Sequence, residues 1–276
     1  MTRKVGYLGP PGTFGEQAAL LYSPQAELVS LPSNGAVVAA VAGGEVEEGI
    51  APIENSLDGA ISDTLDSLIQ HEGVMFRHEL VLPVEQCLIV APGTRLADVA
   101  VVTSHPSALA QCREYIEANL PSARLEAALS TAGAVASAIK TAGAAGIGTA
   151  RAAELNGGVI LARGIQDVKQ NKTRFLVVAA SDAEPTGDDK TSVAFTVAHD
   201  RPGTLIGVLS ELAQRQINLT RIESRPSRED LGIYIFLIDF QGHRRDPVVS
   251  DALAAVQARA HYFRLLGSYP RFVESK

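Results

Sequence analysis

The stretch Asn171-Lys172-Thr173-Arg174-Phe175 runs directly into the apolar stretch Leu176-Val177-Val178-Ala179-Ala180. The apolar part predicts a buried strand, so the polar side chains before it must face a cleft or solvent, and a cleft is where small ligands are held. Arg174 carries a planar guanidinium suited to a carboxylate, and the hydroxyl of Thr173 can both donate and accept a hydrogen bond. The stretch therefore indicates either a site for a carboxylate-bearing substrate or an ordinary solvated strand entry.

Composition restricts the class of protein. The 276 residues allow two domains, and the hydrophobic fraction of 46% and charged fraction of 20% are typical of a soluble globular chain. A formal charge of -7 argues against a nucleic-acid partner, and no apolar run approaches the roughly 18 residues that cross a membrane. Cys87 and Cys112 lie in apolar surroundings, which favours reduced, packed thiols over a disulfide or a metal site. Because no signal sequence follows Met1 either, we expect a cytoplasmic protein.

The first motif follows the strand predicted over residues 4–8. Gly9-Pro10-Pro11-Gly12-Thr13-Phe14-Gly15 forms a loop before a helical pattern at residues 16–22. A strand, a glycine-rich turn and a helix start together expose backbone N–H groups that suit an anion. The loop does not match a nucleotide-binding sequence, so a structural turn and a substrate-binding loop both stay open.

A second polar cluster lies in Pro52-Ile53-Glu54-Asn55-Ser56-Leu57-Asp58-Gly59, after a probable parallel strand. In open α/β sheets, ligands bind at that edge. Glu54, Asn55 and Ser56 cannot all be buried without partners, because an unpaired polar group costs on the order of 1 to 3 kcal/mol. A helix cap would explain only one of the three, so the cluster favours a site.

The same pattern of strand, polar turn and helix then recurs. Ser104-His105-Pro106-Ser107 and Ser130-Thr131-Ala132-Gly133 each follow a predicted strand, and Gln111 can point toward the cleft from the helix after His105. His105 alone would also fit a structural loop. The repetition predicts two α/β lobes, the second inserted into the first, facing across a cleft that Thr173 and Arg174 re-enter when the chain returns.

The last part of the chain has a different pattern. Residues 182–190 form a polar linker, and residues 191–276 follow the βαββαβ order of a ferredoxin-like fold, without an acid/base cluster. We therefore expect a binding or assembly module there. The preceding residues 1–181 form the candidate catalytic domain, with one lobe at about 1–80 and 160–181 and the other at about 81–159.

Taken together, the motifs resemble prephenate dehydratase in content, order and spacing. The tail, with Pro202-Gly203-Thr204-Leu205 and Glu223-Ser224-Arg225-Pro226, resembles the phenylalanine-sensing ACT domain of that family. The resemblance implies a two-lobed catalytic domain like the type II periplasmic-binding-protein fold. No chorismate mutase segment precedes Lys4, so the chain resembles the monofunctional form. Gly15 and Thr204 depart from residues common in the family.

The resemblance implies decarboxylative dehydration of prephenate to phenylpyruvate, CO2 and water, without metal or organic cofactor. Thr173 would hydrogen-bond to the leaving hydroxyl, and Glu54 is the candidate proton source or else orients Asn55. We expect Arg174 to bind the pyruvyl carboxylate. The full expected substrate-binding set is Thr13, Phe14, Ser56, Gly59, Ser104, His105, Gln111, Ser130, Thr131, Arg174 and Phe175.

The resemblance also implies regulation by L-phenylalanine, bound between paired ACT domains of a homodimer or homotetramer. The residues expected at that site are Gly203, Thr204, Leu205, Glu223, Ser224, Arg225 and Pro226. Two alternatives remain: a cytosolic amino-acid-sensing protein without chemistry, and an arogenate dehydratase.

Overall fold

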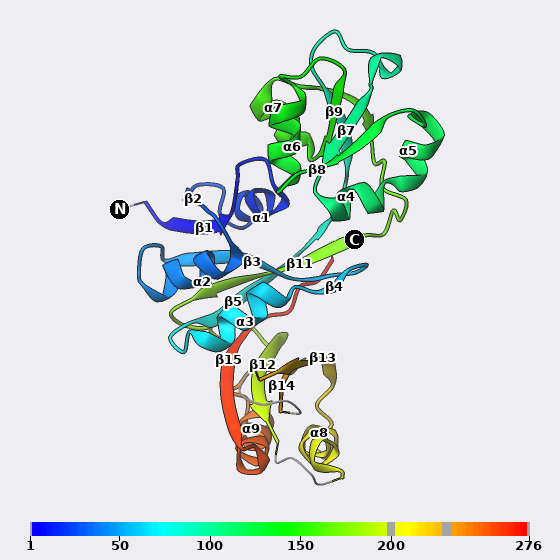
Figure 1. Cartoon of the computed structure of the whole chain (residues 1–276). Coiled ribbons are helices and arrows are strands. Elements are labelled where there is room, and N and C mark those ends of the chain that lie inside the picture. The colour runs from blue at the N-terminus through cyan, green and yellow to red at the C-terminus, as the bar shows by residue number, and fades with distance from the viewer. Residues whose placement is uncertain (1, 198–201, 228–232, 275–276) are drawn as a thin grey trace.

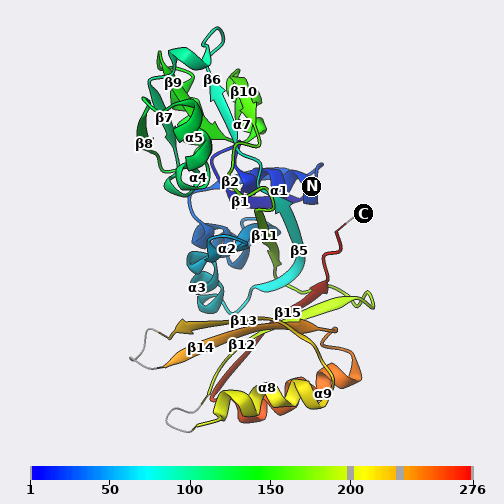
Figure 2. The ribbon, with the colours of Figure 1, turned by 90° about the vertical axis from the view of Figure 1, so that its right-hand side faces the viewer.

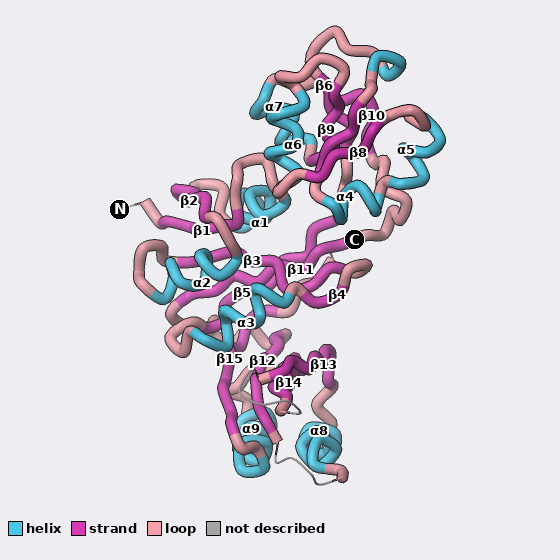
Figure 3. Tube along the Cα trace, in the orientation of Figure 1, coloured by secondary structure: helices cyan, strands magenta, loops and turns pink. Residues whose placement is uncertain are grey.

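Three separate β-sheets follow one another along the length of the molecule (Figure 1). The computed structural model describes residues 2–197, 202–227 and 233–274, so residues 1, 198–201, 228–232 and 275–276 of the predicted domains lie outside the described residues. Two sheets form the lobes of the N-terminal part, and the third belongs to the C-terminal domain. The tube in Figure 3 shows helices flanking each group of strands.

The first lobe is built on a sheet with strand order β2-β1-β3-β11-β5, to which β4 is added beside β3. Strand β11, which the chain forms when it returns from the inserted second lobe, lies between β3 and β5 and runs antiparallel to both. The strands are β1 (Lys4–Leu8), β2 (Glu27–Leu31), β3 (Glu48–Asn55), β4 (Gly59–Ala60), β5 (Met75–Pro83) and β11 (Lys172–Ala179), and the helices are α1 (Phe14–Tyr22), α2 (Asn34–Ala42) and α3 (Ser62–Gln70).

The second lobe has the strand order β10-β6-β9-β7-β8. Strand β10, which the expected boundary at residue 160 assigned mostly to the first lobe, pairs with β6 in this second sheet. The elements are β6 (Cys87–Val90), η1 (Leu96–Asp98), β7 (Val101–Ser104), α4 (Pro106–Gln111), α5 (Arg113–Asn119), β8 (Arg124–Ala127), α6 (Thr131–Ala138), β9 (Ala144–Gly148), α7 (Ala150–Asn156) and β10 (Val159–Arg163).

The C-terminal domain is a four-stranded antiparallel sheet with strand order β13-β14-β12-β15, and its βαββαβ sequence of elements agrees with the prediction. Both helices cover one face of this sheet, and the other face is turned toward the first lobe (Figure 2). The elements are β12 (Asp189–Thr196), α8 (Thr204–Gln214), β13 (Leu219–Pro226), β14 (Tyr234–Gln241), α9 (Pro247–Arg259) and β15 (Tyr262–Pro270).

The first lobe and the C-terminal domain share a hydrophobic core. Leu65 and Phe76 of the lobe belong to the same buried cluster as Leu237 and Tyr269 of the C-terminal sheet. Strand β15 approaches so closely that a Cβ on Gly267 would lie 2.4 Å from the carbonyl oxygen of Phe76, and Gly267 has a positive φ of 132°. Only glycine fits such a position. The two units therefore meet through packed backbone, and the position of the C-terminal sheet is well defined.

The two cysteines are buried and unpaired within the described structure, as predicted. Burial raises the pKa of both thiols, that of Cys112 to about 12. Among the described residues, no helix has the length and apolar character needed to cross a bilayer.

Candidate active site

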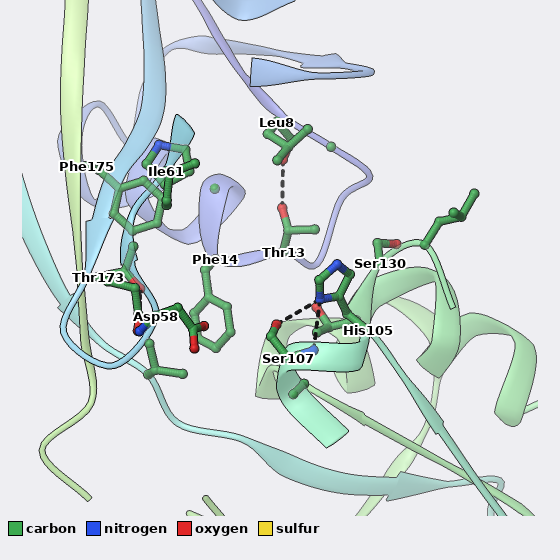
Figure 4. A pocket seen from close by; sticks show the side chains of 18 of the residues that line it. Leu8, Thr13, Phe14, Asp58, Ile61, His105, Ser107, Ser130, Thr173 and Phe175 are labelled. Carbon is green, nitrogen blue, oxygen red and sulfur yellow. Dashed lines mark hydrogen bonds between the residues drawn. The ribbon is translucent and has the colours of Figure 1, made fainter. Parts of the chain in front are cut away.

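A cavity of about 460 Å³ lies between the two lobes, where the carboxyl ends of their parallel strands meet. Figure 4 shows that Thr173, Phe175 and Asp58 line one side, and that His105 and Ser130 line the opposite side. The residues of the expected site that line the cavity are Thr13, Phe14, Asn55, His105, Gln111, Ser130, Thr131, Thr173 and Phe175. The structure therefore brings together most of the residues selected from sequence.

Asn55 and Thr173 form a hydrogen-bonded pair in the wall of this pocket. The Nδ2 of Asn55 donates to Oγ1 of Thr173 across 2.9 Å, and both side chains are buried. The orientation of the Asn55 amide is fixed, because its Oδ1 accepts the backbone N–H groups of Leu57 and Asp58, which can only donate. Since Thr173 accepts from Asn55, its own hydroxyl proton remains free to be donated to a ligand.

Gln111 joins the two lobes across the cleft. Its Nε2 donates to Oδ2 of Asp58 across 2.9 Å, and its Oε1 accepts from Nδ2 of Asn171 across 3.1 Å. Asp58 and Asn171 were not selected from sequence, although Asp58 stands in the second motif and Asn171 opens the stretch that decides the fold. The turn that brings Asp58 to the pocket depends on the side chain of Asn55, which accepts backbone N–H groups of the same loop. An asparagine that can form such a turn was the sequence feature that could have pointed to Asp58.

Helix starts supply positive potential at the pocket. Helices α1, α4 and α6 begin next to it, with Thr13, His105 and Ser130 as their N-cap residues. Each cap side chain accepts a hydrogen bond from the backbone N–H of its helix. Because Nδ1 of His105 accepts the N–H of Ser107, the neutral ring carries its proton on Nε2. Free N–H groups at helix starts attract anions without a cationic side chain.

The charge balance of the pocket is unusual for an anion site. Among the described residues that line it there is no lysine or arginine, and Asp58 is the one carboxyl side chain. Apolar side chains, including Phe14, Ile61 and Phe175, cover much of the wall. A bound anion would therefore meet dipoles and apolar surface instead of a strong cationic clamp.

Four expected substrate-binding residues do not line the pocket, namely Ser56, Gly59, Ser104 and Arg174. Ser104 is fully buried and donates to the carbonyl of Ile147 across 2.7 Å. Ser56 accepts the N–H of Lys172 across 2.9 Å, which ties the second motif to β11. Gly59 pairs with Asn55 and has a φ of 79°. Ser56, Gly59 and Ser104 hold the loops of the site together, and the expectation that they touch substrate is corrected.

The expected roles of Arg174 and Glu54 also need correction. Neither side chain lines the pocket, because successive residues of a strand face opposite sides of the sheet. Arg174 points toward the C-terminal domain, where its Nη1 lies 2.7 Å from Oδ2 of Asp239. Glu54 lies on the same side, 3.5 Å from Nε of Arg221. In this structure, the side chains of Arg174 and Glu54 therefore face away from the pocket, and this geometry does not support the expected contact of Arg174 with the pyruvyl carboxylate or the expected proton delivery by Glu54.

The residues expected to bind phenylalanine lie at two places in the C-terminal domain. Gly203 has a φ of 86° and is the N-cap of α8, which begins with Thr204 and Leu205. Strand β13, at the edge of the sheet, carries Glu223, Ser224, Arg225 and Pro226. Arg225 also contacts the first lobe, with its Nη2 2.8 Å from Oδ1 of Asp66.

Comparisons with known proteins agree with this architecture. Residues 5–183 match the family model described as prephenate dehydratase, and residues 192–257 match the ACT domain. The prephenate dehydratase of Amycolatopsis methanolica is 40% identical over 272 residues, covering 97% of this chain and 88% of that protein.

Solved structures are similar along almost the whole chain. The prephenate dehydratase of Arthrobacter aurescens in complex with L-Phe has a TM-score of 0.89 and 35% identity, covering 97% of this chain and 90% of that one. GqqA, described as a novel type of quorum quenching acylase, also has a TM-score of 0.89, with 30% identity and 98% of both chains covered. These matches confirm the predicted two-lobed fold and the ACT domain. With a family match over more than half of its length and a relative 40% identical along nearly all of it, the chain belongs to the prephenate dehydratase family.

Proposed function

We propose that the pocket between the lobes carries out the reaction of the family, the conversion of prephenate to phenylpyruvate, CO2 and water. The observation that carries this assignment is the Asn55–Thr173 pair, which directs a free hydroxyl proton into a pocket whose described lining has no lysine or arginine. A protein that only binds a carboxylate needs a strong donor for it, whereas an enzyme that expels hydroxide needs a donor at the leaving group.

The chemistry requires two events to be coupled. Loss of CO2 from the ring carbon leaves an electron pair, which completes the aromatic ring and expels the ring hydroxyl. One proton then converts the departing hydroxide into water. A cation held against the ring carboxylate would stabilise the ground state and slow the loss of CO2. An apolar wall of the kind formed by Phe14 and Phe175 does not stabilise the carboxylate in this way and therefore favours its loss as CO2. In this proposal Thr173 hydrogen-bonds to the leaving hydroxyl.

The proton itself is assigned to Asp58. An alcohol such as Thr173 is a poor acid near neutral pH, so it orients the leaving group but does not supply the proton. Asp58 is the carboxyl group that the described lining offers, on the same side of the pocket as Thr173 (Figure 4). Gln111 holds the carboxyl in place from the opposite lobe. Asp58→Asn should lower kcat for prephenate by about a hundredfold or more, whereas an unchanged kcat would remove Asp58 from this role.

The pyruvyl carboxylate is assigned to the second lobe. The Nε2 proton of His105 and the helix starts at Ser130 and Thr131 are the donors on that side of the pocket. This arrangement places the substrate across the cleft, with its ring hydroxyl toward Thr173. It also accounts for an anionic substrate without Arg174.

The test of the proposed function is direct. The purified full-length chain, mixed with prephenate, should consume it and release phenylpyruvate and CO2 in equal amounts. A folded protein that binds prephenate and leaves it unchanged would support the alternative of a sensing protein. Arogenate should be tested in the same assay, because it carries the same ring hydroxyl and ring carboxylate as prephenate. The ratio of kcat/KM for the two compounds then decides between prephenate and arogenate.

Regulation is assigned to the ACT domain. L-phenylalanine is proposed to bind at Gly203 to Leu205 and at Glu223 to Pro226, supported by the L-Phe complex of the Arthrobacter aurescens relative. Strand β13 lies at an edge of its sheet and exposes Ile222, which suits pairing of two ACT domains in a homodimer or a larger homo-oligomer. A cytoplasmic location is proposed from the two reduced, buried cysteines.

A further inference from the structure

Two neighbouring cross-strand pairs connect the pocket to the ACT domain. In the register of β3 and β11, Asn55 lies opposite Thr173, and Glu54 lies opposite Arg174. Side chains alternate between the faces of a sheet, so the first pair faces the pocket and the second faces the ACT domain. The proposed catalytic pair and the ACT contact are therefore separated by the thickness of one sheet.

Arg174 is held tightly on the ACT side. Its Nε donates to Glu79 of β5 across 2.7 Å, its Nη1 to Asp239 of β14 across 2.7 Å, and its Nη2 to Tyr269 of β15 across 2.9 Å. The Arg174 side chain is only 12% exposed. Burial acts to lower the pKa of Arg174, but the facing Tyr269, Asp239 and Glu79 outweigh burial and raise it. The guanidinium is a fixed connection between the two sheets.

Asp239 is equally well fixed within the ACT sheet. Its Oδ1 accepts the hydroxyl of Ser192 across 2.7 Å, and Ser192 also lies 2.7 Å from the hydroxyl of Tyr269. The Asp239 side chain is 4% exposed. The carboxylate is therefore held by its own sheet, and a shift of the ACT sheet would act on Arg174 through this contact.

We propose that Asp239 is a positioning residue for Thr173 and acts through Arg174. The Cα atoms of consecutive residues are about 3.8 Å apart, so a displacement of Arg174 moves Thr173 relative to Asn55. Misplacement of a reacting group by about 1 Å can reduce a rate on the order of a hundredfold. The inference rests on the proposed role of Thr173 and extends it to a residue of the regulatory domain that never touches substrate.

The test uses Asp239→Asn in the full-length chain, with kcat and KM for prephenate measured separately. Because the pocket lining is unchanged, KM should stay within about twofold, whereas kcat should fall by about tenfold or more. Tyr269→Phe removes one hydroxyl from Arg174 without changing a charge, and it should lower kcat in the same direction by a smaller factor.

Asp182→Asn is the matched control. The buried carboxylate of Asp182 also accepts from an arginine, with 2.5 Å between its Oδ2 and Nε of Arg244, but among the described residues neither side chain forms a hydrogen bond or an ion pair with β3 or β11. The control should keep kcat within about twofold of the wild type.

Three results would overturn the inference: full kcat in Asp239→Asn, an equal loss of kcat in Asp182→Asn, or a rise in KM without a change in kcat. If Asp239→Asn does not fold, Tyr269→Phe decides, and full kcat in that variant overturns the inference. A fully active Thr173→Val would instead overturn the proposed function, so the two failures can be told apart.

Discussion

Gln111 of the second lobe donates a hydrogen bond to Asp58 of the first lobe, with 2.9 Å between Nε2 and Oδ2. On the other side of the cleft, the hydroxyl of Thr149 donates to the carbonyl of Gly12 across 2.6 Å. The lobes are thus joined by side-chain contacts at two places, and one of these contacts includes the proposed proton donor. Gln111 therefore contributes both to the contact between the lobes and to the position of Asp58.

Replacing Gln111 should therefore weaken substrate binding. Gln111→Ala removes the bonds to both Asp58 and Asn171, and a loss of about 1.4 kcal/mol would raise KM for prephenate about tenfold. Arg113→Ala, in the exposed pair with Glu117 on the next helix, is a suitable control and should leave KM unchanged. Equal KM values in Gln111→Ala and wild type would show that the joined lobes do not matter for binding.

The hydroxyl of Thr173 should be needed for the chemical step. Thr173→Val keeps the β-branched shape but removes the donor, so kcat should fall by about a hundredfold to ten-thousandfold with little change in KM. Ser104→Ala is the comparison, because Ser104 donates to Ile147 outside the pocket lining. That variant should retain kcat and lose about 1 kcal/mol of stability. Comparable kcat values in the two variants would contradict the role of Thr173.

The architecture was predictable because its signals are local. Alternating strands and helices with polar turns indicated the two lobes, and the meeting of Asn55 with Thr173 followed from their places at strand ends. Arg174 and Glu54 were expected on the cleft side of the sheet, and the structure places them on the other side. Because successive side chains of a strand alternate between the two faces, Arg174 could have been expected on the face opposite to that of Thr173. What no local pattern could reveal was the partner on that face, the buried Asp239 from 65 residues further along the chain.

The structure predicts that Arg174 matters for stability and not for substrate binding. Arg174→Met leaves Asp239 without its buried cation, which should lower the free energy of unfolding by about 3 to 5 kcal/mol. KM for prephenate should stay within about twofold, measured on enzyme shown to be folded. Arg95→Ala, in an exposed pair with Asp98, should change stability by less than about 1 kcal/mol. A large rise in KM at unchanged stability would return Arg174 to the substrate site.

The contact between Asp239 and Arg174 should also make stability depend on acid. Burial acts to raise the pKa of Asp239, but Arg174 and Arg221 overcome it, so its folded-state pKa lies below the ordinary value. A lowered folded-state pKa gives stability that is complete above the unfolded pKa of about 3.9 and is lost as pH falls through the folded value. The difference in urea midpoint between wild type and Asp239→Asn should therefore be constant from about pH 5 to 8 and shrink below about pH 4. Asp182→Asn is the control, because it removes another carboxyl group with a lowered pKa. In the double variant, the acid-dependent losses of stability from the two substitutions should add, as expected for independent sites. A difference that persists unchanged to the lowest pH at which the chain is folded would mean that the Asp239 carboxylate is not what stabilises this contact.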